Sequence, residues 1–236
     1  MSQKITNGME IENYCFNRSR FKLTTINLLS FETKSFLGRL FFSRKPLLNK
    51  NEANLLHLGC GSKKLEGWIN ADFFRDLKFW KKGKNRPDWM LDLRYPLDCE
   101  DNVWDGVFSE HTLEHLYPDE VLKLLKELRR TMKPNSWLRI SVPDLEKYID
   151  YYKTQDVPEE FLIKKYGGCE AIAYLTQNYK HCSVWDNKLL ESFLQKAGFI
   201  NIQQVSFRKG NNEKLLKDSK TREWESLYIE CQKPTS

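Results

Sequence analysis

The sequence contains no run of about 18 uncharged apolar residues, which is the length that marks a candidate transmembrane helix. Its first residues, MSQKITNGMEIENYC, lack the apolar core of a secretory signal. None of its six cysteines belongs to a C-x-x-C pair, and a chain of 236 residues can bury a core without disulfides. We therefore expect free thiols and a cytoplasmic location.

Most of the chain also lacks net charge. Residues 1–50 contain nine Lys/Arg and three Asp/Glu, which accounts for the whole net charge of +6, and residues 51–236 are neutral. A nucleic-acid-binding protein usually spreads positive charge over its folded domain. The distribution makes nucleic acid an unlikely partner and divides the chain into a basic N-terminal arm or lid (1–50) and a main domain (51–236).

Within the arm, Phe36, Leu37, Leu40 and Phe41 recur at helical spacing among basic residues. A helix packed on the main domain explains this pattern. A substrate lid, or weak contact with a membrane surface through residues 34–48, explains it as well.

The main domain alternates short apolar runs with helical patterns. The expected strands are NLLHL (54–58), WINAD (68–72), DWMLDL (88–93), DGVFS (105–109) and SWLRISVPD (136–144). An amphipathic helix begins at Pro118, and another follows the fifth strand around 145–153. Such alternation is typical of a doubly wound α/β fold, with a mostly parallel sheet covered on both faces.

The end of the chain has a different pattern. A helix expected between Asp186 and Gly198 precedes two β-rich runs, 199–207 and 224–232, which a polar loop joins as an antiparallel pair. Residues 154–185 fit no strand and suggest a lid-like insertion after the fifth strand. Aromatic residues within the insertion and just before it either stack on a bound ring or pack the insertion onto the sheet. They are Tyr151, Tyr152, Tyr166, Tyr174, Tyr179 and Trp185.

The stretch NLLHLGCGSKKLEGWINADF (54–73) contains a glycine loop that lacks a third glycine. A dinucleotide fingerprint needs G-x-G-x-x-G and an acid about 20 residues later, whereas Lys64 stands at the third glycine position and Asp72 follows early. The P-loop pattern is absent too. The spacing therefore excludes both phosphate-binding motifs. We expect Lys63 and Lys64 to lie in a solvated turn and His57 to be a core histidine.

Acidic residues follow successive expected strands: Asp72, Asp92, Glu110 and Asp144. They would line the edge of the sheet where ligands bind in this fold class. Carboxylates there would repel a pyrophosphate, but they accept hydrogen bonds from a ribose diol and attract a cation. S-adenosylmethionine, which has a ribose, an adenine and a sulfonium, fits such an edge.

These motifs, together with LDLRYPLDCEDNVWDGVFSEHTLEHL, ELRRTMKPNSWLRISVPDLEKYI and ESLYIECQK, resemble those of class I S-adenosylmethionine-dependent methyltransferases. The resemblance is strongest to a bacterial branch that acts on small molecules and glycans. It implies a seven-stranded sheet with an antiparallel last strand. The chain departs from the family pattern near Lys63, where a third glycine is missing and the gap to the acid is short, so we expect the first crossover helix to be truncated to a turn. The resemblance also implies the cofactor-binding residues, which are Gly59, Cys60, Gly61, Asp72, Asp92, Leu93, Ser109 and Glu110.

Methyl transfer to a hydroxyl also requires a base, whereas an amine acceptor only has to be neutral. We predict His111 as the base because it directly follows the fourth strand, with His181 and Tyr179 as alternatives. The expected acceptor is a hydroxyl or amine of a small molecule or glycan.

Two other functions stay open at this stage. The protein could be a non-catalytic binding protein that keeps the cofactor fold. It could also be a zinc peptidase, because His111-x-x-Glu114-His115 matches the H-x-x-E-H motif. A zinc site needs a third ligand, and few histidines remain, so we expect no metal.

Overall fold

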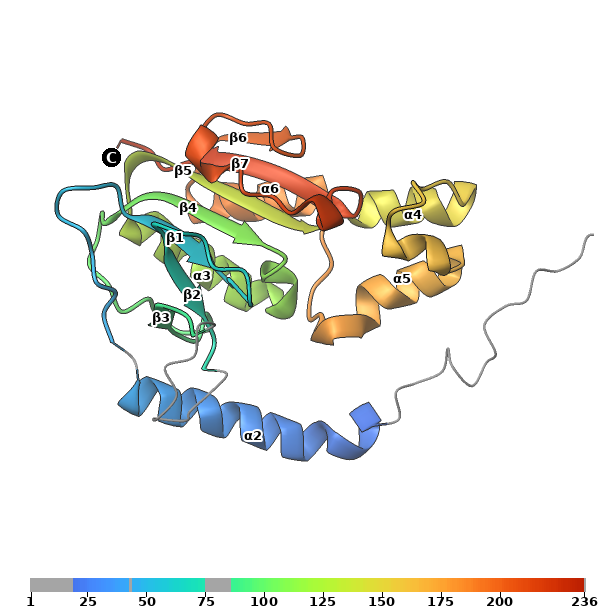
Figure 1. Ribbon diagram of the computed structural model, residues 1–236, viewed down its shortest axis with the longest axis horizontal. Helices are drawn as coiled ribbons and strands as arrows, with labels where there is room; N and C mark the ends of the chain where they lie inside the picture. The colour runs from blue at the N-terminus through green and yellow to red at the C-terminus, as the bar shows by residue number, and fades with distance from the viewer. Residues whose placement is uncertain (1–18, 43, 75–85, 236) are drawn as a thin grey trace, which may run out of the picture.

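The computed structural model describes residues 19–42, 44–74 and 86–235. Seven strands form one sheet in the order β3-β2-β1-β4-β5-β7-β6 (Figure 1). Every pair from β3 to β5 is parallel, and β7 is antiparallel to both of its neighbours. The strands are β1 (Leu55–Leu58), β2 (Ile69–Asp72), β3 (Trp89–Met90), β4 (Trp104–Glu110), β5 (Met132–Pro143), β6 (Ile200–Val205) and β7 (Ser226–Gln232). The predicted fold class and terminal antiparallel pair are confirmed.

The helices follow local sequence signals. α3 (Pro118–Thr131) begins at the proline and buries Val121, Leu124, Leu125 and Leu128. α6 (Asn187–Ala197) starts where the Asp186 carboxylate accepts a hydrogen bond from the Leu189 N–H, and ends at Gly198 with φ +86°. Both helices lie on one face of the sheet in the main hydrophobic core.

The opposite face is covered by loops. No helix connects β1 to β2, as the missing glycines predict, and Trp68 from that connection packs with Phe108 and Leu215. Leu215 belongs to η4 (Glu213–Leu215), within the loop that joins β6 to β7; a further short helix, η5 (Lys220–Arg222), follows it.

The insertion is helical and has a small core of its own. α4 (Leu145–Thr154) packs against α5 (Gly168–Gln177), and η2 (Leu162–Lys165) and η3 (Asn178–Lys180) flank α5. Asp144 caps α4 by accepting a hydrogen bond from the Glu146 N–H at 3.0 Å. The last of the strand-end acids is therefore a helix cap.

The helix α2 (Ser19–Phe41) lies beside the part of the domain that contains β2 and β3 (Figure 1), and its buried residues among those described are small. Ser35 is fully buried, and Gly38 packs so closely on Phe74 that a Cβ atom would lie 2.3 Å from its ring. Phe36 and Phe41 are exposed. The predicted contact of 34–48 with a membrane surface stays a prediction. Among the described residues, no helix is long and apolar enough to cross a membrane.

One buried ion cluster fixes the loop between β6 and β7. Arg139 on β5 donates from Nη2 to Asp218 Oδ2 at 2.6 Å and from Nη1 to Glu230 Oε1 at 2.7 Å. All three side chains are fully buried. We call these residues the Arg139 cluster. A buried cation between two carboxylates holds them together because neither acid can stay charged there alone.

The Arg139 cluster predicts a stability effect. Arg139→Met leaves two buried carboxylates facing each other and should lower the free energy of unfolding by about 3–5 kcal/mol. Chemical denaturation measures this loss. Adding Asp218→Asn and Glu230→Gln to that variant should recover part of it, and Lys123→Ala, which removes an exposed ion pair, should leave the midpoint in place. Equal midpoints for the single variant and wild type would contradict the cluster's role.

His57 predicts a pH dependence. Its ring is buried in β1, Nδ1 lies 3.2 Å from Asn70 Oδ1, and burial lowers the pKa of the imidazole from its usual 6.5 to about 4. The unfolded chain therefore takes up a proton first as the pH falls from 6.5 to 4, and the fold loses up to about 3 kcal/mol of stability over that range. Denaturation at several pH values should show a shallower decline for His57→Gln than for wild type. Parallel curves would contradict this assignment.

Candidate active site

The loop after β1 needs its glycines. Gly59 and Gly61 have φ values of +65° and +56°, in the left-handed region that favours glycine. A Cβ atom on Gly59 would lie 2.0 Å from Thr112 Oγ1, whereas one on Gly61 would meet nothing within 4 Å. Gly59 is thus required by packing, and Gly61 lies beside open space. Cys60, between them, is buried and donates its N–H to the Ala71 carbonyl at 3.1 Å.

The structure brings Asp72 to this loop. Its Oδ2 accepts a hydrogen bond from the Gly61 N–H at 2.6 Å, and its Oδ1 accepts one from the Phe73 N–H at 2.7 Å. The side chain lies at the carboxyl end of β2, beside β1. The predicted loop and the predicted acid therefore form one local unit.

Asp92 lies in a second unit, under α2. Its Oδ2 accepts a hydrogen bond from Ser35 Oγ at 2.5 Å, and Arg94 donates to both of its oxygens. Arg94 also pairs with Glu32 at 2.6 Å. Although burial opposes ionisation, the Arg94 and Ser35 hydrogen bonds hold the pKa of Asp92 below its usual value. Leu93 follows Asp92 and is half-buried against the main core.

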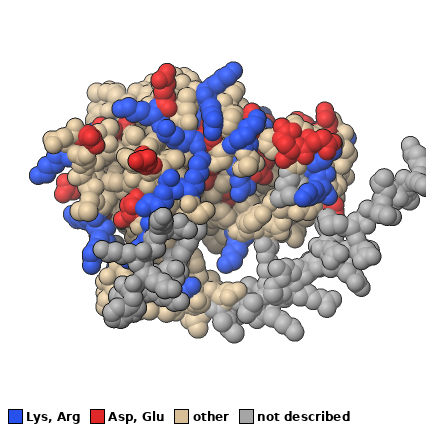
Figure 2. All heavy atoms as spheres, in the orientation of Figure 1, with Lys and Arg blue, Asp and Glu red and all other residues tan. Residues whose placement is uncertain are grey.

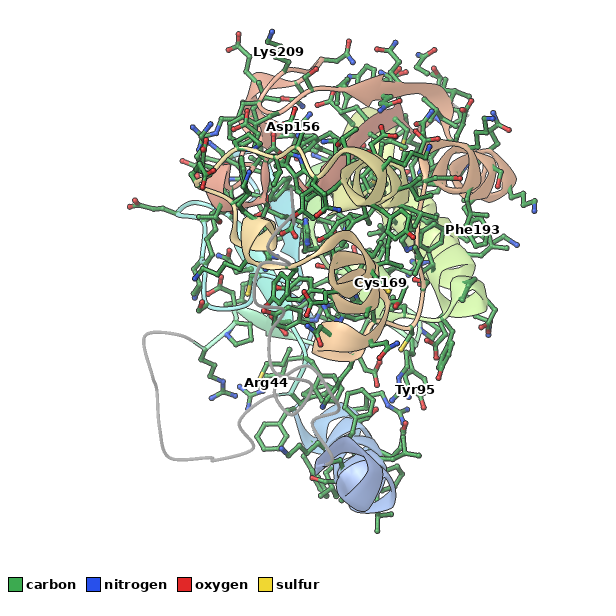
Figure 3. The ribbon with its side chains drawn as sticks, turned by 90° about the vertical axis from the view of Figure 1, so that its right-hand side faces the viewer. Arg44, Tyr95, Asp156, Cys169, Phe193 and Lys209 are labelled. Atoms are coloured by element: carbon green, nitrogen blue, oxygen red, sulfur yellow. The ribbon has the colours of Figure 1, made fainter. Side chains whose placement is uncertain are left out.

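The same region has aromatic walls. Phe31 of α2 stacks on Phe73 with ring centroids 4.5 Å apart, and the Arg39 guanidinium lies 3.6 Å from the centre of the Tyr95 ring. Tyr95 lies above α2 in Figure 3. A pocket of about 240 Å³ opens between α2 and β3, lined in part by Arg39, Asp92 and Tyr95.

Glu110, at the end of β4, holds the loop that precedes β7. Its Oε1 accepts a hydrogen bond from the Ser219 N–H at 2.7 Å, and its Oε2 accepts one from the Ser219 hydroxyl. Lys63 Nζ donates to the Lys217 carbonyl at 2.8 Å and lies 3.8 Å from Glu110. Ser109, the residue before, has a buried hydroxyl with no hydrogen-bond partner among the described residues.

Lys63 and Lys64 are exposed after the turn that follows β1, as expected for a solvated turn, and each also has a partner elsewhere in the sequence. Lys63 reaches the loop at 217–219, and Lys64 pairs with Asp88 at 2.5 Å. Both partners are far away in the sequence, so the pattern of the turn itself gave no sign of them.

His111 is buried directly after β4 and has a φ of +49°, which is uncommon for residues other than glycine. Its Nε2 lies 2.7 Å from Ser226 Oγ, and the Ser226 hydroxyl donates to the Arg222 carbonyl. The Ser226 oxygen therefore accepts a hydrogen bond from the Nε2–H group of His111. Burial, followed by the charge of Arg222, keeps the pKa of His111 well below its usual value, so the ring is neutral.

The peptidase geometry predicted as an alternative is wrong. His111 and His115 do not share one α-helix, because His111 has left-handed backbone angles and the short helix η1 spans only Leu113–His115. The H-x-x-E-H motif needs its two histidines one turn apart on a helix.

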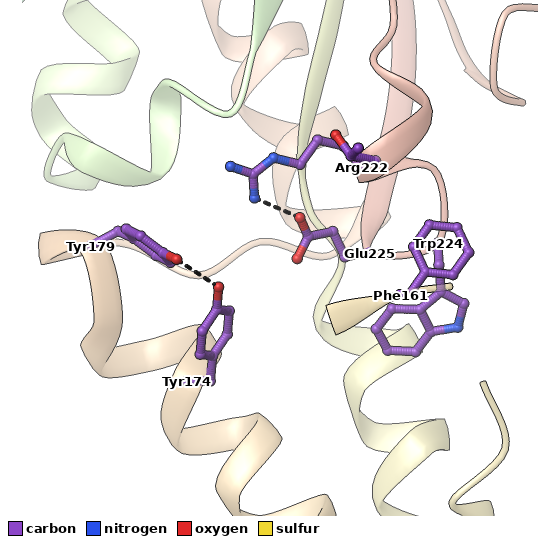
Figure 4. A pocket seen from close by; sticks show the side chains of 7 residues that line it. Phe161, Tyr174, Tyr179, Arg222, Trp224 and Glu225 are labelled. Carbon is purple, nitrogen blue, oxygen red and sulfur yellow. Dashed lines mark hydrogen bonds and ion pairs between the residues drawn. The ribbon is translucent and has the colours of Figure 1, made fainter. Parts of the chain in front are cut away.

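A pocket of about 250 Å³ lies between the insertion and the segment before β7 (Figure 4). Tyr174 donates to the Tyr179 hydroxyl at 2.9 Å on one side, and Arg222 pairs with Glu225 at 2.6 Å on the other. The lining residues are Phe161, Tyr174, Tyr179, Thr221, Arg222, Trp224 and Glu225.

The aromatic residues of the insertion divide between the two predicted roles. Tyr151 and Trp185 are buried in hydrophobic cores, whereas Tyr174 and Tyr179 line the pocket. Sequence reasoning missed Arg222 and Glu225 as pocket residues, because Arg222 lies in a polar segment with no motif and Glu225 was assigned only to the start of an expected strand.

The chain is similar to known proteins in sequence and in structure. A family model described as a methyltransferase domain matches residues 32–204. No match was found among curated proteins. A solved S-adenosylmethionine-dependent methyltransferase from Archaeoglobus fulgidus is 19% identical, with 89% of this chain and 99% of that chain covered and a TM-score of 0.48.

Two further solved structures are similar. A possible histamine N-methyltransferase from Thermotoga maritima is 14% identical over 92% of this chain and 96% of its own, with a TM-score of 0.47. Phosphoethanolamine N-methyltransferase 2 from Haemonchus contortus is 12% identical over 97% of this chain and 61% of its own, with a TM-score of 0.43. The family match spans well over half of the chain, which thus belongs to the methyltransferase-domain family and is an S-adenosylmethionine-dependent methyltransferase.

Proposed function

We propose that the protein transfers a methyl group from S-adenosylmethionine to a hydroxyl or amine of a small molecule or glycan bound in the pocket of Figure 4. The observation that carries the proposal is the position of this pocket. The segment 217–222 runs from the proposed cofactor edge to this pocket. Ser219 bonds Glu110 at the end of β4, and Arg222, three residues later, lines the pocket.

The proposed cofactor site is the edge formed by the ends of β1, β2 and β4. Gly61 offers open space and positive backbone angles, which suits the methionine part above Gly59, Cys60 and Gly61. The Asp72 carboxylate beside this loop suits the ribose diol. The buried Ser109 hydroxyl, which has no hydrogen-bond partner among the described residues, offers a further polar contact.

The remaining cofactor contacts follow the sheet. Asp92 and Leu93 are proposed for the adenine edge, where α2 provides aromatic neighbours. Because Ser35 and Arg94 already bond Asp92, that carboxylate would act as part of a fixed wall. Glu110 is proposed beside the methionine half, and its bonds to Ser219 fix its position.

When bound, S-adenosylmethionine supplies a methyl group on a sulfonium, which is a good leaving group. The protein then has to hold the acceptor atom in line with that methyl group, and positioning of this kind supplies much of the rate. An oxygen acceptor also gives up a proton. We propose that His111 takes it, since His111 follows Glu110 directly and is linked through Ser226 to Arg222 of the pocket.

The pocket itself supports a small polar acceptor. Aromatic side chains stack on rings, and the Arg222–Glu225 pair offers both hydrogen-bond donors and acceptors. Acidic and basic side chains are interspersed on the face shown in Figure 2, which fits a neutral ligand better than a long polyanion. These features favour the small-molecule and glycan branch of the family.

We also propose a cytoplasmic location. The support is chemical: the five cysteines in the described part of the chain are free thiols, and disulfides are rare in reducing compartments.

Asp72 provides the first functional test. Asp72→Asn keeps an oxygen for the Gly61 N–H but removes the charge and one ribose acceptor. It should weaken binding of S-adenosylhomocysteine about 10- to 100-fold in calorimetry, the range for a hydrogen bond to a charged group. The control Asp150→Asn, on the exposed side of α4, should bind normally. Unchanged affinity in Asp72→Asn would place the ribose elsewhere.

His111 provides the second test. A panel of small hydroxyl, amine and glycan acceptors is screened by release of S-adenosylhomocysteine. With a hydroxyl acceptor found in this way, His111→Gln should lower kcat about 10²- to 10⁴-fold while leaving S-adenosylhomocysteine affinity within a few-fold of wild type. Tyr179→Phe serves as the comparison. If Tyr179→Phe loses the activity and His111→Gln keeps it, the base is Tyr179.

A further inference from the structure

Glu114, His115 and His181 bring three potential metal ligands together. One ligand atom from each lies within 4.8 Å of the others. Glu114 and His115 belong to η1, and His181 directly follows η3 of the insertion. The fold joins positions more than sixty residues apart in the sequence, so neither segment reveals the group by itself.

Glu114 is the strongest sign that a ligand is missing from this group. Its side chain is 2% exposed, and neither carboxylate oxygen has a hydrogen-bond partner among the described residues. His111 Nδ1 lies 3.4 Å from Glu114 Oε1. Burial raises the pKa of Glu114 to about 8. Buried carboxylates are normally hydrogen-bonded, ion-paired or bound to a metal, so an unsatisfied one needs an explanation.

The histidines are oriented as metal ligands usually are. His181 donates its Nδ1–H to the Leu175 carbonyl at 2.6 Å, which fixes the tautomer with the lone pair on Nε2. Burial lowers the pKa of His115, and the backbone carbonyls of Lys180 and Tyr179 beside its ring partly oppose that effect. Histidine ligands typically donate their other ring N–H to a carbonyl in this way. The two rings lie 5.1 Å apart between centroids, at 67°.

The backbone holds the two ligand-bearing segments in place. The N–H groups of Cys182 and Ser183 both donate to the Glu114 carbonyl, at 2.7 and 3.1 Å. These bonds attach the end of the insertion to η1. The ligand atoms are therefore positioned before any ion arrives, and the exposed ring of His115 leaves a route from solvent.

We propose that Glu114, His115 and His181 bind one divalent first-row transition-metal ion, such as Zn²⁺. Two imidazoles and one carboxylate suit such ions, and Mg²⁺ and Ca²⁺ prefer oxygen ligands. With three protein ligands, at least one coordination position stays open, as in catalytic zinc sites. This differs from both earlier expectations: no metal, or a peptidase pair of His111 and His115.

The site adjoins the pocket proposed for the acceptor. Tyr179, which lines that pocket, has its ring centroid 6.2 Å from that of His181. An ion there would hold an acceptor oxygen at its open position and stabilise the negative charge that develops when the oxygen loses its proton. This role rests on the proposed function, whereas binding of the ion does not.

The experiment uses the full chain, stripped with a chelator and then dialysed against Zn²⁺ or Co²⁺. We expect one ion per chain by elemental analysis, and Co²⁺ absorption bands typical of nitrogen and oxygen ligands. Glu114→Gln keeps the side-chain shape and removes a charge that is costly to bury, so it should fold at least as stably as wild type. It should weaken Zn²⁺ binding by more than the roughly 10- to 100-fold seen when an outer-shell partner is lost.

Further variants identify the ligands. His181→Asn should lose Zn²⁺ like Glu114→Gln, whereas Cys182→Ser, a change in the adjacent residue, should retain it. Substoichiometric binding by wild type, or full Zn²⁺ affinity in both ligand variants, would overturn the site. Calorimetry with S-adenosylhomocysteine on the same samples separates the two proposals, because a protein that binds it but takes up no metal refutes only the metal site.

Discussion

The geometry of the active site depends on a buried positive charge on the fifth strand. Arg139 binds Asp218 and Glu230, and thereby fixes a loop that has little regular structure of its own. Ser219 follows Asp218 and provides both hydrogen bonds that hold the Glu110 carboxylate. Arg222 lies one turn further on and lines the proposed acceptor pocket. A polar loop can hold catalytic geometry only when such contacts fix it to a rigid element.

A second consequence of the fold concerns the adenine side. The sequence suggested that the arm might be a lid, and the structure shows how its helix is attached. Asp92 accepts hydrogen bonds from Ser35 and Arg94, and Arg94 also donates to Glu32 of the same helix. The small side chains of Ser35 and Gly38 allow the close approach, whereas Phe36, Leu40 and Phe41 stay exposed. Burial is decided here by close contact of the helix with Phe74, and hydrophobic spacing alone points to the wrong face.

Local signals in the sequence predicted the fold well. Alternating strands and helices gave the sheet, Asp186 and Gly198 gave the limits of α6, and the missing glycines gave the helix-free link between β1 and β2. Asp72 was also predictable in its position, because strand ends meet at one edge of a parallel sheet.

Long-range polar contacts could not be predicted in the same way. Lys63 meets the Lys217 carbonyl, Asp92 meets Ser35, and Glu114 meets His181 across segments that are distant in the sequence. Nothing in the residue pattern indicates which of these polar groups will meet. The H-x-x-E-H stretch illustrates the difference. Its spacing suggested a pair of histidines on one helix, but the left-handed backbone at His111 separates that residue from the turn that holds Glu114 and His115.

The segment 217–222 is shared by both halves of the site. Lys63, which follows the proposed cofactor loop, bonds the Lys217 carbonyl at one end, and Arg222 forms part of the proposed acceptor pocket at the other. A ligand that orders one end of so short a segment reduces the entropy that remains to be lost at the other end. Such coupling is reciprocal: whatever one substrate gains in affinity from the presence of the other, the second gains equally from the first. On the proposed assignment of the two sites, this shared segment would couple the binding of the cofactor to the binding of the acceptor.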